Sequence, residues 1–528
     1  MAHESSKKMI TLGTGGLGTG GLGTGGLTFD DVIAVARYGA KVELSSAAIT
    51  AMSASRAFIE KYASGDTPVY GVSTGFGALA TRHIDVKDRV QLQKSLIRSH
   101  AAGVGPAVEK EVVRALMFLR LRTMATGRTG VRVELAQTFI DFLNADITPV
   151  VPEFGSLGCS GDLAPLSHCA LSMMGEGRVH NPQGEVVDSL VAMKAAGIMP
   201  IELEEKEGLA LINGTDGMLG MLIMAIRDLE ELTRVADVTA AMSIEGLLGT
   251  DKVFAPDLHF PLRPQVGQAI SAANIFGLLK GSGIVASHLN DTSQVQDAYS
   301  LRCAPQVAGA VRDTIAYAAT IAERELQSAI DNPVILPDGR IQSNGNFHGA
   351  PLAYVLDFLA IAAADLGSIA ERRTDRALDK ARNFGLPPFL ADDPGVDSGL
   401  MIAQYTQAGL VSENKRLATP ASVDSIPSSA MQEDHVSMGW SAARKLRKVV
   451  ENLSRILAIE LVTSARAIDL RSGLTPSAAT GKVISELRKS VAGPGPDRFI
   501  SPELEAADAL VRSGRVSEVA REVFAELR

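Results

Sequence analysis

The stretch from Gly155 to Leu166 has the most unusual chemical potential in the chain and reads Gly-Ser-Leu-Gly-Cys-Ser-Gly-Asp-Leu-Ala-Pro-Leu. At its centre a serine directly precedes a glycine, in Cys159-Ser160-Gly161. Because glycine reaches backbone conformations closed to other residues, the Gly161 nitrogen could attack the carbonyl carbon of Cys159. Ring closure with loss of water, and dehydration of Ser160, would leave an exocyclic methylidene group. That group is an electrophile, and none of the ordinary side chains is a good one.

The same tripeptide also fits a glycine-rich turn before a helix, with Asp162 as the N-cap. The flanking residues favour the ring. Gly-Cys-Ser-Gly-Asp-Leu-Ala-Pro-Leu-Ser-His resembles the signature of the aromatic amino acid ammonia-lyases, in which an Ala-Ser-Gly triad cyclises to 4-methylidene-imidazol-5-one (MIO). Cys159 replaces the usual Ala, but it would contribute only its carbonyl and a ring substituent. The resemblance, which spans about residues 29–470, therefore implies MIO from Cys159-Ser160-Gly161 and no external cofactor.

The resemblance also gives roles to residues that local patterns leave open. Tyr70 lies in the glycine-rich segment 69–77, which predicts a loop, and by itself it fits an amphipathic residue with a satisfied hydroxyl. Asn213 interrupts an apolar helical pattern, where a polar group is costly unless it is used. In the family, the tyrosine is a base over the active site and the asparagine lies beside MIO and the substrate carboxylate.

A second group of polar side chains follows at a spacing of three residues: Gln296, Tyr299 and Arg302. On one helical turn they would share a face, and that face could equally be solvated. An arginine suits a carboxylate because its guanidinium matches both oxygens. The resemblance implies that Arg302 binds the substrate carboxylate, that Gln296 contributes to substrate binding, and that Tyr299 positions the substrate.

Two positions indicate which amino acid would bind. The helical pattern of residues 86–101 ends in Ser99-His100, where family members specific for histidine resemble Ser-His rather than Phe-Leu or His-Leu. Glu433 stands where those specific for histidine carry an acid, and a carboxylate can accept an imidazole N–H. The resemblance adds Phe347 as a wall of the pocket and Gln432 as a substrate-binding residue. It thus implies conversion of L-histidine to trans-urocanate and ammonia.

Other functions remain alternatives. A tyrosine or phenylalanine ammonia-lyase, or an aminomutase that re-adds the ammonia, would share most of these residues. An inactive helical scaffold is more distant, because the tyrosine, serine, asparagine and arginine are all in place. A metal site is not expected, since the chain has no His-Glu-x-x-His motif and its nine histidines are scattered.

Composition limits the class of protein. The 528 residues are 46% hydrophobic but only 5% aromatic, which favours helices built from Ala, Leu and Met. A net charge of −9 without a basic block argues against nucleic-acid binding. Only three cysteines are present, and polar residues interrupt every long apolar run, so we expect a cytoplasmic protein without a membrane span.

The expected fold is mainly α: a long-helix bundle core with a loop-rich N-terminal region, of the ammonia-lyase/fumarase-like helical superfamily. A three-fold Gly-Thr-Gly-Gly-Leu repeat predicts a flexible leader rather than a phosphate loop. The resemblance implies a homotetramer with sites shared between subunits. The predicted regions are a leader (1–27), an N-terminal region with the tyrosine and MIO loops (28–205), a central bundle (206–470) and a C-terminal helical extension (471–528).

Overall fold

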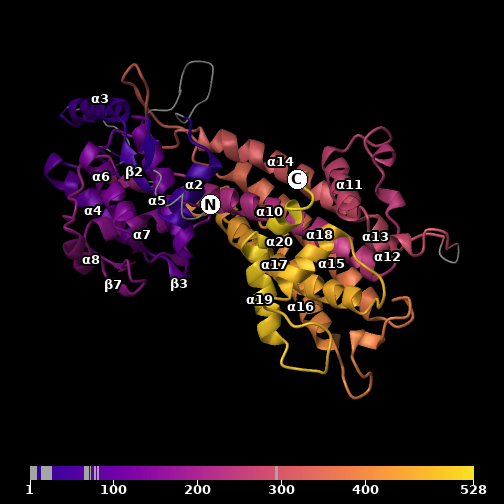
Figure 1. Cartoon of the computed structure of the whole chain (residues 1–528). Coiled ribbons are helices and arrows are strands. Elements are labelled where there is room, and N and C mark those ends of the chain that lie inside the picture. Colours follow the sequence, from indigo (N-terminus) through magenta and orange to yellow (C-terminus); the bar gives the residue numbers. More distant parts are fainter. Residues whose placement is uncertain are drawn as a thin grey trace. The chain divides into compact units, whose positions relative to one another are not determined.

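The computed structural model describes the chain apart from residues 1–8, 14–25, 65–70, 72, 76–78, 80–81 and 292–294. The described part is mainly α, as predicted, and its strands are short (Figure 1). Tyr70 and most of the Gly-Thr-Gly-Gly-Leu repeat lie outside the described residues. The roles predicted for them therefore stay predictions.

The chain forms two compact units. Unit 1 comprises Met1–Met224, Ala319–Leu356 and Ala421–Arg444, and unit 2 comprises Ala225–Ala318, Asp357–Pro420 and Lys445–Arg528. Four of the five unit boundaries fall within long helices: α10 (Asp216–Gly246), α14 (Ala304–Leu326), α15 (Ala350–Leu378) and α17 (Gly439–Asp469). The fifth, between Pro420 and Ala421, lies outside the helices.

Unit 1 has a fully buried helix, α5 (Lys110–Ala125), at its core. Every residue from Val112 to Ala125 is buried, including three arginines. One of them, Arg114, donates from Nε to the Val35 carbonyl at 3.0 Å and so joins α5 to α2. Figure 1 shows the remaining helices of the unit in indigo and violet: α2 (Phe29–Tyr38), α3 (Ser46–Ala63), α4 (Arg89–His100), α6 (Val133–Asn144), α7 (Leu163–Met173), α8 (Ser189–Ala196) and α9 (Glu207–Ile212).

The strands of unit 1 form small sheets. β1 (Met9–Leu12) pairs in parallel with β2 (Lys41–Leu44), and its alternate residues Ile10 and Leu12 are buried. The expectation of a leader without regular structure therefore does not hold for these four residues. The other strands are β3 (Val104–Ala107) with β5 (Pro152–Phe154), β4 (Thr148–Pro149) with β6 (Arg178–His180) and β7 (Val186–Asp188), and β8 (Val334–Ile335) with β9 (Ile341–Gln342).

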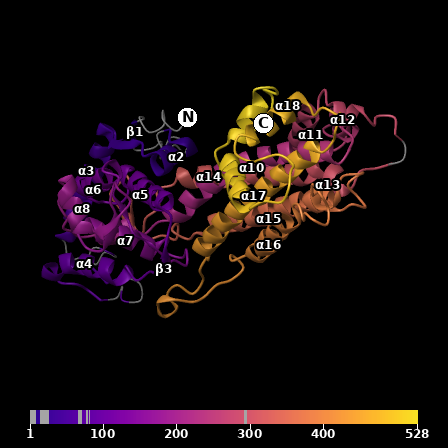
Figure 2. The same ribbon diagram turned by 60° about the horizontal axis from the view of Figure 1, so that its bottom comes forward.

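Unit 2 is a helical bundle held together by a buried ion pair. Arg373 of α15 donates to Glu460 of α17 through Nη2 at 3.0 Å, and Thr239 and Ser243 of α10 donate to the same carboxylate at 2.8 Å each. Figure 2 shows α15, α16 and α17 side by side. The remaining helices of unit 2 are α11 (Val266–Leu278), α12 (Gly283–Ala286), α13 (Tyr299–Arg302), α16 (Met401–Leu417), α18 (Ala478–Leu487), α19 (Ser501–Arg512) and α20 (Arg515–Arg521).

Two helical stretches, Glu207–Gly246 and Ala350–Leu378, are long and apolar enough to cross a membrane by length and composition alone. In the first, the most apolar window is 100% buried within the protein, and in the second 61% is buried. A helix that is apolar on all sides is also typical of the core of a large protein. The first stretch is broken at Asn213, where the sequence predicts an interruption.

Candidate active site

The predicted triad lies in the loop between β5 and α7, and its glycine cannot be replaced. Gly161 has a φ of +78°, in the left-handed region, and a Cβ built there would lie 2.2 Å from the carbonyl oxygen of Gly214. Asp162 N donates to that same oxygen at 2.8 Å. The backbone around residue 214 therefore lies in direct contact with the triad, and position 161 has room only for glycine.

Glu433 contacts both other members of the triad. Its Oε1 accepts from the Ser160 hydroxyl at 3.2 Å, and its Oε2 lies 3.1 Å from the Cys159 sulfur. The Ser428 hydroxyl also donates to Oε2, at 3.0 Å, and backbone bonds pair residues 428 and 433 as an antiparallel bridge. The structure thus places the acid predicted for imidazole recognition directly at the predicted electrophile.

The Glu433 loop and the triad loop are joined by buried hydrogen bonds. The Ser437 hydroxyl donates to the Gly158 carbonyl at 2.7 Å, and Met438 N donates to the Leu157 carbonyl at 2.9 Å. Just beyond, in the first turn of α17, the indole N–H of Trp440 donates to the Glu153 carbonyl at 2.7 Å. Three successive contacts therefore fix the start of α17 against the triad loop.

We expect Ser437→Ala to lower the free energy of unfolding by about 0.5–1.5 kcal/mol, because it removes this hydrogen bond and leaves the Gly158 carbonyl with Gly349 N as its donor. Urea unfolding measures the loss. Ser53→Ala is the control, since the exposed Ser53 hydroxyl only donates to the Ile49 carbonyl within its own helix. Equal stability of the two variants would show that the Ser437 bond does not hold these loops together.

Asp162 caps a helix, although a different one from that predicted. It precedes α7, but its side chain makes no capping bond there. Instead its Oδ2 accepts from Gly217 N at 2.9 Å and Met218 N at 3.0 Å, in the first turn of α10. Burial raises the pKa of Asp162 to about 7. The triad loop is thereby tied to the helix that follows Asn213.

Asn213 ends α9 beside this loop. Its side-chain Oδ1 is buried and has no hydrogen-bond partner among the described residues. The backbone is held by Arg120 of α5, whose Nη1 donates to the Asn213 carbonyl at 2.8 Å. A buried acceptor without a donor raises the free energy of the folded protein. A bound group that donates a hydrogen bond to Asn213 Oδ1 would remove this cost.

Ser99 and His100 end α4, as the pattern predicts. The Ser99 hydroxyl donates to the Leu96 carbonyl at 3.0 Å and also lies 3.0 Å from His100 Nδ1. A neutral ring can make the second contact through Nδ1 as donor or as acceptor, according to its tautomer. Burial lowers the pKa of His100, against the opposing effect of the Glu433 carboxylate, and so favours that neutral ring.

The other residues predicted to bind the substrate have fewer contacts. Phe347 is half-buried in the turn before α15, where Gly349 N donates to the Gly158 carbonyl at 3.1 Å. This bond brings the Phe347 turn to the triad loop. Gln432 is exposed, and its backbone N–H closes a turn onto the Ser429 carbonyl.

Gln296, Tyr299 and Arg302 belong to unit 2, and they do not share one helical turn. Helix α13 begins only at Tyr299, so Gln296 lies outside it, in an exposed bend. Asp297 accepts from Thr250 N at 2.8 Å and holds the preceding chain away from helical geometry. The Arg302 guanidinium lies 4.6 Å from the centre of the Tyr299 ring. Its Nε is buried without a hydrogen-bond partner in the described part of the chain, and Tyr299 is 71% exposed.

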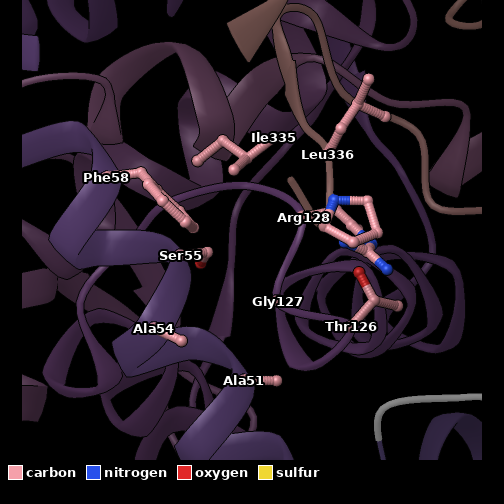
Figure 3. A pocket seen from close by; sticks show the side chains of 10 residues that line it. Ala51, Ala54, Ser55, Phe58, Thr126, Gly127, Arg128, Ile335 and Leu336 are labelled. Carbon is pink, nitrogen blue, oxygen red and sulfur yellow. The ribbon is translucent and has the colours of Figure 1, made fainter. Parts of the chain in front are cut away.

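A pocket elsewhere in unit 1 contains none of these residues. It has a volume of about 310 Å³ and is lined by Phe58 of α3, Arg128 and Ile335, among others (Figure 3). Among the described residues, no group of three or more His, Cys, Asp or Glu side chains is placed to hold a metal ion.

Two contributors to the site are not among the residues singled out from the sequence. Ser428 fixes Glu433, but a serine in a serine-rich loop carries no distinguishing pattern. Arg120 had a detectable signal, because it is one of three arginines in a helical pattern that is otherwise mostly apolar from Val112 to Ala125, and a buried charge must be paired. It also donates to the Ile330 carbonyl at 2.7 Å.

Comparison with known proteins identifies the family of the chain. The aromatic amino acid lyase family matches residues 27–489. A histidine ammonia-lyase of Streptomyces avermitilis is 67% identical over 519 residues, which are 98% of this chain and 99% of the relative. The crystal structure of histidine ammonia-lyase from Trypanosoma cruzi has a TM-score of 0.88 and 38% identity, covering 98% of this chain and 97% of that one. A tyrosine aminomutase from Streptomyces globisporus also has a TM-score of 0.88 and 38% identity, covering 94% and 97%. The chain therefore belongs to the aromatic amino acid lyase family and is a carbon–nitrogen lyase.

Proposed function

We propose that this enzyme eliminates ammonia from L-histidine and releases trans-urocanate. The observation that carries the proposal is the position of Glu433, whose carboxylate lies within hydrogen-bonding distance of both Cys159 and Ser160. A carboxylate at this position can accept a hydrogen bond from an imidazole N–H, whereas a phenyl ring has no hydrogen-bond donor. The histidine ammonia-lyases of Streptomyces avermitilis and Streptomyces coelicolor, 67% and 65% identical, support the same substrate.

We propose further that Cys159-Ser160-Gly161 forms MIO. The local structure fits this group, because Gly161 has a φ of +78° and Asn213 Oδ1 is buried without a hydrogen-bond partner among the described residues. When formed, this group would supply an electrophilic carbon toward the substrate amine, which would help the amine to leave. Residues around the loop would hold the substrate while its β-proton is removed.

Each residue has a proposed task in that reaction. Arg302 pairs with the substrate carboxylate, and Asn213 and Tyr299 orient the substrate, with Gln296 and Gln432 contributing further polar contacts. Glu433 and His100, supported by Ser99, bind the imidazole, and Phe347 forms the wall of the pocket. Tyr70 is the proposed base for the β-proton, because a phenol that loses its proton can accept one from carbon.

We also propose a cytoplasmic homotetramer in which sites are shared between subunits. Tyr299 is exposed, and Arg302 Nε has no hydrogen-bond partner in the part of the chain that the structure describes. Both facts support a role for these side chains in binding something outside the core of their own unit. Sedimentation gives the oligomer mass. A mixture of refolded Ser160→Ala and Arg302→Lys proteins should regain activity if sites are shared, and should stay at the level of its components if they are not.

The direct test offers histidine, tyrosine and phenylalanine separately and follows urocanate, coumarate and cinnamate by absorbance. We expect urocanate to form by far the fastest. The intact mass of the protein should be lower than the sequence mass by two molecules of water. Faster formation of coumarate at equal substrate would contradict the selectivity, and a full sequence mass in an active enzyme would contradict MIO.

An aminomutase is the second candidate, and the similarity to the tyrosine aminomutase of Streptomyces globisporus favours including it. Such an enzyme would return the ammonia to the β-carbon before release. Chromatography of the products distinguishes the two, since only the aminomutase yields a β-amino acid.

For Arg302→Lys we expect a fall of about tenfold to a hundredfold in kcat/KM, because lysine keeps the charge but loses the two-pronged contact with a carboxylate. Steady-state kinetics with histidine measures it. Arg128→Lys is the control, because Arg128 lines the separate pocket of unit 1. An unchanged kcat/KM in Arg302→Lys would show that Arg302 does not bind the substrate carboxylate.

A further inference from the structure

Glu433 has a different set of hydrogen-bond donors on each of its two oxygens. Oε1 accepts only from the Ser160 hydroxyl in the described part of the chain, at 3.2 Å. Oε2 accepts from the Ser428 hydroxyl at 3.0 Å and faces the Cys159 sulfur at 3.1 Å. Burial raises the pKa of the Cys159 thiol to about 12, with a further contribution from the Glu433 carboxylate. The thiol is therefore protonated at neutral pH and acts as a donor.

Formation of MIO would change only one of these two sets. Dehydration breaks the Cα–H and Cβ–Oγ bonds of Ser160, forms the Cα=Cβ double bond, and releases the oxygen as water. The donor to Oε1 then no longer exists. Ring closure uses the carbonyl carbon of Cys159 and leaves its side chain intact, so both donors to Oε2 remain.

We infer that Cys159 is a positioning residue for Glu433: together with Ser428 it anchors Oε2, so that Oε1, freed when Ser160 is dehydrated, accepts the ring N–H of the substrate. The inference rests on the proposed function. It explains why a thiol at this position, where the family usually has Ala, would matter to the site. An anchored carboxylate loses less freedom when it binds the substrate, and this favours binding.

The experiment compares the wild type with Cys159→Ala, Cys159→Ser and Cys169→Ala. Cys169 is a matched control, because it is also buried in unit 1 but has no hydrogen bond to Glu433 within the described residues. Three quantities are measured for each protein: the mass lost on maturation, the dissociation constants of urocanate and cinnamate, and kcat and KM for histidine.

We expect Cys159→Ala to lose both water molecules like the wild type, yet to bind urocanate about fivefold more weakly, with a similar rise in KM and little change in kcat. Cinnamate, which has no ring N–H, should bind equally to all four proteins. Cys159→Ser restores a donor and should recover urocanate binding. Cys169→Ala should match the wild type throughout.

Several results would overturn the inference. One is unchanged urocanate affinity in Cys159→Ala, and another is a Cys159→Ser protein no better than Cys159→Ala. Retention of water by Cys159→Ala would also overturn it, because the thiol would then serve maturation instead of positioning. Failure of the proposed function is distinguishable, since it would appear in the wild type as a full sequence mass or as no release of urocanate.

Discussion

We expect Ser160→Ala to fold like the wild type but to lose at least about 10³-fold in activity, because it could no longer provide the proposed methylidene electrophile. Folding should survive, since the Ser160 side chain makes only its bond to Glu433 in the described structure. Circular dichroism should be unchanged, and the near-ultraviolet absorbance of the mature protein should be absent.

Ser167→Ala is the matched control. It removes a buried hydroxyl from neighbouring α7 that donates to the Leu163 carbonyl at 2.7 Å, and it should keep both absorbance and activity. Turnover by Ser160→Ala at a rate like that of the wild type would show that the enzyme does not use a group derived from this serine.

Replacing Glu433 should have the second largest effect. We expect Glu433→Ala to lose roughly 10³-fold or more in kcat/KM for histidine, because a site built to hydrogen-bond its substrate is left with an unpaired imidazole N–H. Glu433→Gln keeps the shape and an acceptor but not the charge, and should lose less. Any weak kcat/KM for phenylalanine should fall by a smaller factor than the kcat/KM for histidine. Replacing Ser99-His100 by Phe-Leu should shift preference further toward phenylalanine.

Because Glu433 also contacts Ser160, the mass of each variant must be measured beside its kinetics. Asp434→Asn is the control, since Asp434 is the exposed neighbour in the same loop. A matured Glu433→Ala enzyme with equal losses on histidine and phenylalanine would show that the carboxylate has a general role and does not recognise the ring.

Local patterns were sufficient to predict much of the framework. Helix α4 ends at His100 and the helix pair α9–α10 is broken at Asn213, as expected, because apolar spacing and polar interruptions act over a few residues. The strand at Met9–Leu12 escaped prediction, since its partner is the distant β2 and four residues carry little periodicity.

Long-range pairing explains most of what the sequence could not predict. Cys159 and Glu433 are 274 positions apart, and no local pattern indicates that their side chains meet. Asp162 caps α10 instead of the helix that follows it, because the first turn of α10 lies against the triad loop. Positive φ angles at Ser429, Ala430 and Met431, which strain non-glycine residues, bend the chain just before Glu433.

The position of Trp440 makes it a reporter of one part of the molecule. It is the chain's single tryptophan, it is 2% exposed, and it lies in unit 1 beside the triad loop. Its fluorescence emission will therefore follow solvent entry into unit 1, whereas far-ultraviolet dichroism follows the helices of both units. Denaturation curves from the two signals coincide only if the units unfold as one cooperative block. The intrinsic fluorescence of the unlabelled enzyme thus separates the stability of the triad loop region from that of the bundle.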